Sequence, residues 1–166
     1  MAERANLRNP LASARASLRN KIKQPPNDWD ARAILTVPGI AWTVSSETCA
    51  TGRLSAPENV AYDHFYREFV FRQPANEAEL GAIMSAESEE VFGCYRFDGL
   101  ARWTSRSVGA WMEDMDVVLG YVGHVLSTET DAEIVDGLKR YAAYLTSSEF
   151  KDYLGDFRRS LDAGRR

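Results

Sequence analysis

The fold is decided by residues 108–126, VGAWMEDMDVVLGYVGHVL, and by the two apolar patterns that follow them. Apolar side chains recur here every three or four residues over about five turns, which is the period of one helix face. The members of this stripe are Val108, Trp111, Met112, Met115, Val118, Leu119, Val122, Val125 and Leu126. A stripe of this width needs a partner surface to bury it.

Two more helices are predicted after this stretch. Thr130 and Glu133 have the spacing of a capping box, which predicts a helix start there. Ser148 is predicted to cap a last helix that ends near Gly164. The inward-facing side chains of these helices are Ile134, Leu138, Tyr141 and Leu145, and then Phe150, Tyr153, Leu154, Phe157 and Leu161. The connections are short, so the helices should pack antiparallel.

The middle of the chain carries weaker patterns. Ser55 and Glu58 form a second capping box, which predicts an aromatic helix over residues 57–69. A short helix is expected over 76–86, and a small β element between 33 and 54 or near 91–97. Pro38-Gly39 indicates a turn inside the first of these regions. We therefore expect a mainly α fold: an antiparallel, bundle-like domain of five or six helices with a small β element, and α+β as the alternative.

The N-terminal segment, residues 1–24, is predicted to be a separate amphipathic helix. Asn9 is a suitable N-cap and Pro10 suits the first helical position. Pro25-Pro26 ends the pattern because proline restricts the residue before it and donates no hydrogen bond. The apolar stripe consists of Leu7, Leu11, Ala14, Leu18 and Ile22. Residues 27–166 then form a single, mostly helical globular domain.

The charge divides at the same boundary. Residues 1–23 carry six Lys and Arg against one Glu, a net charge of +5. Residues 24–166 carry 14 Lys and Arg against 23 Asp and Glu, a net charge of −9. An acidic body repels phosphate backbones, so nucleic acid is not expected to bind the body, although residues 1–23 remain available to it. No apolar run reaches the roughly 18–20 residues of a transmembrane helix.

Catalytic and metal-binding motifs are weak. Cys49 with His64, or Cys94 with His124, would make a thiolate–imidazole pair only if the fold brought the two together. The sequence has no paired zinc-ligand spacing, no calcium loop and no glycine-rich phosphate loop. Glu87, Glu89 and Glu90 form a cluster of carboxylates with no partner pattern. We therefore assign no catalytic residue, cofactor or metal from sequence, and leave enzyme activity open while leaning against it.

Two sets of side chains are candidates for partner binding. Glu113, Asp114 and Asp116 lie opposite the apolar stripe and make either a solvated face or an acidic docking patch. Arg8, Arg15 and Arg19 flank the apolar stripe of the N-terminal segment. Candidates for a ligand pocket, which would equally fill an ordinary core, are Trp103, Trp111, Tyr121, His124 and Cys94.

Three functions follow as hypotheses. The first is a non-enzymatic protein-binding module, an acidic inhibitor- or immunity-like protein that occupies a basic surface of its partner. The second is a subunit of a larger assembly, anchored by the basic N-terminal segment. The third is a small-molecule-binding protein or enzyme with a pocket near Trp103, Trp111 and His124. We expect a cytoplasmic protein; the alternative is targeting to an organelle through the basic segment.

Overall fold

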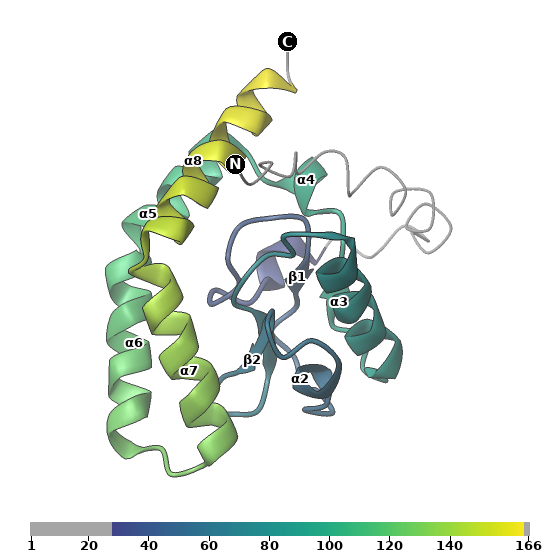
Figure 1. Ribbon diagram of the computed structural model, residues 1–166, viewed down its shortest axis with the longest axis vertical. Helices are drawn as coiled ribbons and strands as arrows, with labels where there is room; N and C mark the ends of the chain where they lie inside the picture. Colours follow the sequence, from purple (N-terminus) through teal and green to yellow (C-terminus); the bar gives the residue numbers. More distant parts are fainter. Residues whose placement is uncertain (1–27, 165–166) are drawn as a thin grey trace.

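The computed structural model describes residues 28–164, and its C-terminal half forms two antiparallel helical columns (Figure 1). The first column consists of α5 (Ser105–Glu113) and α6 (Met115–Thr128). The second consists of α7 (Ala132–Leu145) and α8 (Ser148–Ala163). Helix α6 packs against α7, and α5 packs against α8. The predicted antiparallel helical core is thus present.

A small layer of strands lies beside α7. Strand β2 (Val60–Tyr62) pairs antiparallel with β3 (Glu68–Val70), and β1 (Trp42–Thr43) pairs antiparallel with β4 (Tyr95–Arg96). Helix α7 packs directly on β2. Its Gly137 comes close to the Ala61 side chain, so the helix and the strand approach tightly.

The remaining helices complete the second side of the strand layer. Helix α3 (Glu77–Glu89) lies across the strands from the two columns, beside the one-turn helix α2 (Gly52–Ser55) (Figure 1). Two other short elements are the 3-10 helix η1 (Trp29–Ala31) and helix α4 (Gly99–Arg102). The fold is therefore mainly α with a small antiparallel β element, as predicted. No helix in residues 28–164 is long and apolar enough to cross a membrane.

The strand layer separates two hydrophobic cores. The larger core joins β2 and β3 to α5–α8 and contains Trp103, Trp111 and Tyr141. The smaller core lies between the strands and α3 and contains Val60, Ile83, Cys94 and Tyr95. Strand residues contribute to both cores, which explains why the β2–β3 pair has no exposed face: β2 and β3 are buried at every position.

The predicted aromatic helix over 57–69 is wrong. Ser55 ends α2, and the following residues form the β2–β3 hairpin. The reversal is fixed by Asp63, whose Oδ1 accepts hydrogen bonds from the N–H groups of Phe65 (2.8 Å) and Arg67 (2.9 Å). Tyr66 adopts the left-handed conformation with φ 59°. The local Asp turn and the β-prone residues on either side of it outweigh the capping signal.

The predicted stripe over 108–126 is divided between two helices. Asp114 ends α5 and precedes α6, with φ −81° and ψ −2°. Aspartate is a poor residue for a helix interior because its side chain competes for backbone hydrogen bonds. The apolar spacing continues across the break, which is why the sequence pattern did not reveal it.

The turn predicted at Pro38-Gly39 does not lead to a local hairpin. Pairing between its flanks is limited to one bridge, between Arg32 and Val44, while β1 pairs with the distant β4. The backbone of this loop is satisfied by the buried side chain of Gln73 instead. Its Nε2 donates to the carbonyls of Val37 (2.7 Å) and Ala41 (2.8 Å), and its Oε1 accepts from the Ala41 N–H (3.0 Å).

Candidate functional site

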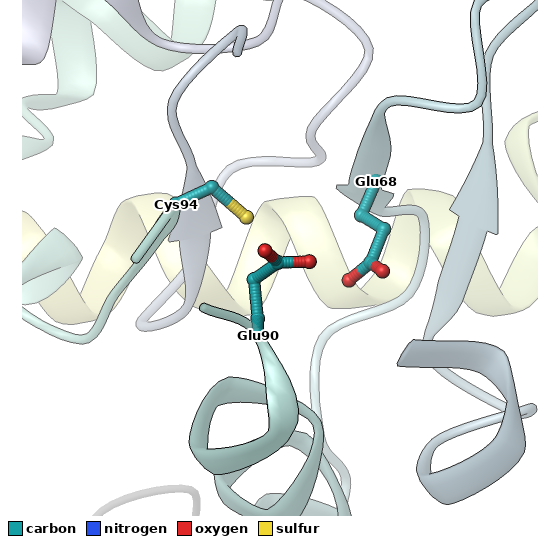
Figure 2. Close-up of side chains that lie close together, drawn as sticks. All are labelled: Glu68, Glu90 and Cys94. Carbon is teal, nitrogen blue, oxygen red and sulfur yellow. The ribbon is translucent and has the colours of Figure 1, made fainter. Parts of the chain in front are cut away.

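Two features of the structure are candidates for ligand binding. The first is a buried cluster of two carboxylates and a thiol. Glu68, Glu90 and Cys94 each offer one ligand atom, and these atoms all lie within 4.8 Å of one another. Figure 2 shows the thiol of Cys94 directed toward the carboxylate of Glu90, with the carboxylate of Glu68 on the other side. Glu68 belongs to β3, Glu90 follows α3, and Cys94 precedes β4. The fold therefore brings Glu68 to Glu90 and Cys94, which are themselves only four residues apart in sequence.

Hydrogen bonds hold both carboxylates in place. Glu68 Oε1 accepts from the N–H groups of Thr51 and Gly52, both at 3.0 Å, and its Oε2 accepts from the Tyr95 hydroxyl. Glu90 Oε2 accepts from the N–H of Cys49 at 2.7 Å, and its Oε1 accepts from the N–H of Phe92 at 2.9 Å. All five donors are uncharged, and neither carboxylate makes an ion pair within residues 28–164.

The loop before α2 is shaped around this cluster. A Cβ on Gly52 would lie under 3.0 Å from the Glu68 carboxylate and the Tyr95 hydroxyl, so only glycine allows the approach. Ala50, two residues earlier, has a positive φ of 54°, and its carbonyl accepts a hydrogen bond of 2.8 Å from the Tyr62 hydroxyl. The buried polar groups thus determine the path of residues 49–52.

Burial dominates the electrostatics of the cluster. It raises the pKa of Glu68, and the charge of Glu90 raises it further, against the lowering effect of the three hydrogen bonds. Burial also raises the pKa of the Cys94 thiol, with the two carboxylates adding to the effect. The charged forms of Glu68 and Cys94 are therefore disfavoured unless a cation lies beside them.

The second feature is an apolar groove between the β2–β3 turn and α6. Its cavity volume is about 270 Å³. The lining residues come from four places: the segment after η1, the residue Ser45 after β1, the hairpin, and the first half of α6. They are Ala33, Ile34, Leu35, Ser45, Asp63, Phe65, Arg67, Glu68, Phe69, Val117, Val118 and Tyr121.

Three large apolar side chains of this groove are exposed. Ile34, Phe65 and Val117 have exposed fractions of 55%, 68% and 67%. Two of them have a defined neighbour: Trp111 Nε1 donates to the Ile34 carbonyl at 3.1 Å, and the Arg67 guanidinium lies 5.0 Å from the centre of the Phe65 ring. Val117 is exposed on α6.

The acidic candidates lie beside this groove. Glu113, Asp114 and Asp116 are exposed at the junction of α5 and α6, immediately before Val117. None of the three makes an ion pair within the described part of the chain. Their negative charge is therefore available to a partner.

The ligand-pocket candidates are not gathered at one site. Trp103 and Trp111 are buried in the larger core, and Cys94 is buried in the smaller one. Tyr121 lines the groove, where its hydroxyl accepts from the His64 N–H at 3.4 Å. His124 is exposed on α6. Candidates Arg8, Arg15 and Arg19 lie outside the described residues.

Neither of the two cysteine–histidine pairs is joined by a hydrogen bond within residues 28–164. Cys94 is buried beside the carboxylates, whereas His124 is exposed on a helix of the opposite layer. His64 Nδ1 bonds instead to Glu129 Oε2 at 2.8 Å. Cys49 is exposed, and its backbone N–H, not its thiol, contacts the cluster.

Sequence reasoning missed Glu68, Glu90, Phe65 and Val117 as site residues. One signal for Glu68 was present, because it begins the β-prone run Glu68-Phe69-Val70-Phe71, where a charged residue is unusual. Glu90 had no such signal, since it follows two other glutamates that are exposed or half-buried. No family model matches this chain, and neither a curated protein nor a solved structure matches it.

Proposed function

We propose that this chain is a protein-binding module of the acidic inhibitor or immunity type, and that the groove beside α6 receives an apolar side chain of its partner. The observation that carries the proposal is that exposed Ile34, Phe65 and Val117 line the groove, next to Glu113, Asp114 and Asp116, which make no ion pair within residues 28–164. A complementary partner segment carries one large apolar residue flanked by Arg or Lys.

The chemistry of the groove supports a protein partner over a small molecule. Small-molecule sites usually enclose about 300–1,000 Å³ and cover most of the ligand. This groove has a volume of about 270 Å³, and its rim side chains are mostly exposed. Exposed apolar anchors surrounded by charge are typical of an interface core with its polar rim.

Charge adds speed and selectivity to such a contact. Residues 24–166 carry a net charge of −9, so a basic partner is attracted over the whole acidic surface. Electrostatic complementarity mainly raises the association rate and disfavours acidic competitors. Some inhibitor-like proteins must bind their target before the target acts. Such proteins depend on a high association rate.

The test is capture of a partner by the full chain with a matched pair of variants. Val117→Ser removes an apolar anchor from the groove, and Val91→Ser makes the same change at an exposed valine outside it. We expect Val117→Ser, combined with Phe65→Ser, to reduce retention of the partner by at least about 10-fold. Val91→Ser should retain the partner as well as the unchanged chain.

Either of two results would refute this assignment. One is retention of the partner by the double variant at the unchanged level. The other is equal loss with Val91→Ser, which would place the contact elsewhere. The assembly-subunit hypothesis makes a different prediction. It expects loss of the partner when Arg8, Arg15 and Arg19 are all changed to Gln in the full chain, and retention of the partner by the groove variants.

A further inference from the structure

We propose that Glu68, Glu90 and Cys94 bind one divalent transition-metal ion of the zinc class. Glu68 also lines the groove, but the metal site does not rest on the function proposed for the groove. The three side chains come from β3, the end of α3 and the start of β4, so a bound ion would join the strand layer to α3. The ion would have a structural role in the smaller core.

The cluster lacks a positive partner although it is buried. The exposed fractions are 1% for Glu68, 5% for Glu90 and 1% for Cys94. Two carboxylates this close repel each other strongly away from water, unless a proton or a cation lies between them. Within residues 28–164 no lysine, arginine or histidine pairs with either one.

The thiol gives a second, independent indication of a ligand. Cys94 is buried in the smaller core, and its Sγ forms no hydrogen bond to another residue within the described part of the chain; it points toward the two carboxylates (Figure 2). A structural buried thiol normally packs as a small apolar group. An unpartnered thiol directed at two carboxylates instead completes a mixed oxygen–sulfur ligand set.

The ligand types select the ion. Carboxylate oxygen and thiolate sulfur together suit zinc and neighbouring transition metals, whereas magnesium and calcium require oxygen alone. Zinc binds oxygen at about 2.0–2.2 Å and sulfur at about 2.3 Å. Binding would draw the three ligand atoms together by on the order of 1 Å from their present spacing.

The surroundings resemble the outer shell of a metal site. Glu68 is oriented by the N–H groups of Thr51 and Gly52 and by the Tyr95 hydroxyl. Glu90 is oriented by the N–H groups of Cys49 and Phe92. Such outer hydrogen bonds fix ligand geometry. Glu90 and Cys94 stand at the two ends of the exposed turn 91–93, so the cluster lies directly beneath a surface loop.

The experiment uses the full chain after treatment with a chelator. Zinc is added, and bound metal per chain and the thermal midpoint Tm are measured. We expect one zinc per chain and a rise in Tm of about 5–10 °C at 100-fold excess over Kd. The same concentration of magnesium should leave Tm unchanged.

Cobalt identifies the ligands. Cysteine binds metals as the thiolate. Cobalt(II) bound to a thiolate has a sulfur-to-metal charge-transfer absorption, which therefore reports on the cysteine ligand. Cys94→Ser should abolish this absorption, and Cys49→Ser, which changes the exposed cysteine nearby, should keep it. Tyr95→Phe removes one hydrogen bond to Glu68 and should weaken cobalt binding by about 10–100-fold.

Glu68→Gln separates metal binding from folding. The glutamine oxygen can still accept from Thr51 and Gly52, while its amide donates to the Tyr95 oxygen. The variant removes one of two repelling charges, so its metal-free Tm should equal or exceed that of the unchanged chain. Its Tm should no longer respond to zinc.

Three results would overturn the proposal. The first is that neither zinc nor cobalt binds, which would mean that the two carboxylates share a proton and hold no metal ion. The second is an unchanged cobalt spectrum in Cys94→Ser. The third is a spectrum lost in Cys49→Ser alone, which would mean an adventitious ion only, held at the exposed thiol.

Discussion

Gly52 is the residue on which the position of the Glu68 carboxylate depends. Any side chain there meets the carboxylate and the Tyr95 hydroxyl, both of which are fixed by buried bonds. We predict that Gly52→Ala lowers the free energy of unfolding by about 1–3 kcal/mol, the usual cost of overpacking. Urea unfolding measures this value.

Gly120→Ala is the matched control. Gly120 is exposed in α6, and an added Cβ there meets nothing within 4 Å. Alanine is the better helix former, so this change should stabilise the chain by up to about 1 kcal/mol. If both glycine variants behave alike, the close approach at Gly52 has no energetic weight.

Trp103 and His124, both candidates for one ligand pocket, have different environments in the fold. Trp103 is fully buried and packs edge-on against Trp29 at 5.1 Å, with the Arg32 guanidinium 4.7 Å from the centre of the Trp103 ring. We predict that Trp103→Ala lowers the free energy of unfolding by about 3–5 kcal/mol, whereas His124→Ala changes it by less than about 0.5 kcal/mol. Denaturant titration of both variants decides this; a mild Trp103→Ala would contradict the assignment of Trp103 to the core.

Single residues limited what the sequence could reveal of the site. The cluster is assembled from Glu68, Glu90 and Cys94, and only the tertiary fold brings Glu68 to the other two. Glu90 is buried while its neighbour Glu89 is exposed, although the two have the same chemistry. Neither spacing nor composition distinguishes such neighbours, because burial depends on how α3 ends against the strands.

At the scale of elements, the helices with the strongest apolar period were predictable, and so were the β regions at 33–54 and 91–97, where β1 and β4 lie; the β2–β3 hairpin was not. Residues 132–163 form helices as expected, with each N-cap one residue from its predicted place: Asp131 instead of Thr130, and Ser147 instead of Ser148. The β2–β3 hairpin was mistaken for a helix because its short strands are buried on both faces and show no alternation.

Glu79 connects α3 to the strand layer, and its charge makes that connection sensitive to pH. Burial raises the pKa of Glu79, but hydrogen bonds from the Ala75 N–H and the Asn59 amide, together with the charge of Arg72, lower it by more. Its pKa in the folded chain is therefore below the ordinary value of 4.5. The ionised form stabilises the fold above that value, and this contribution disappears as the pH falls through the lowered pKa.

We predict that Glu79→Gln lowers Tm at pH 7 and that its difference from the unchanged chain shrinks below about pH 4. Thermal unfolding between pH 3 and pH 7 measures both effects. Glu47→Gln is the control, since the Glu47 side chain is exposed and forms no hydrogen bond within residues 28–164. A Glu79→Gln deficit that stays constant over this range would show that the carboxylate charge has no part in the connection.

For the molecule as a whole, the separation of charge predicts how association depends on salt. Exposed charges are screened beyond about 8 Å at physiological ionic strength. Changing Glu113, Asp114 and Asp116 together to Lys should slow association with a basic partner by about 10-fold at low salt. The difference should diminish at 0.5 M salt, and stopped-flow measurement would detect it. Equal slowing at both salt concentrations would point to lost contacts and not to lost attraction.

The central claim, that the groove beside α6 is where a partner binds, is tested most directly by site-specific photo-crosslinking. A photoreactive phenylalanine analogue is placed at Phe65 in the groove or at Phe92, which is comparably exposed outside it; their exposed fractions are 68% and 57%. The account predicts crosslinks to the captured partner from position 65 and none from position 92. Crosslinks from position 92 alone, or from neither position while the partner is retained, would contradict it.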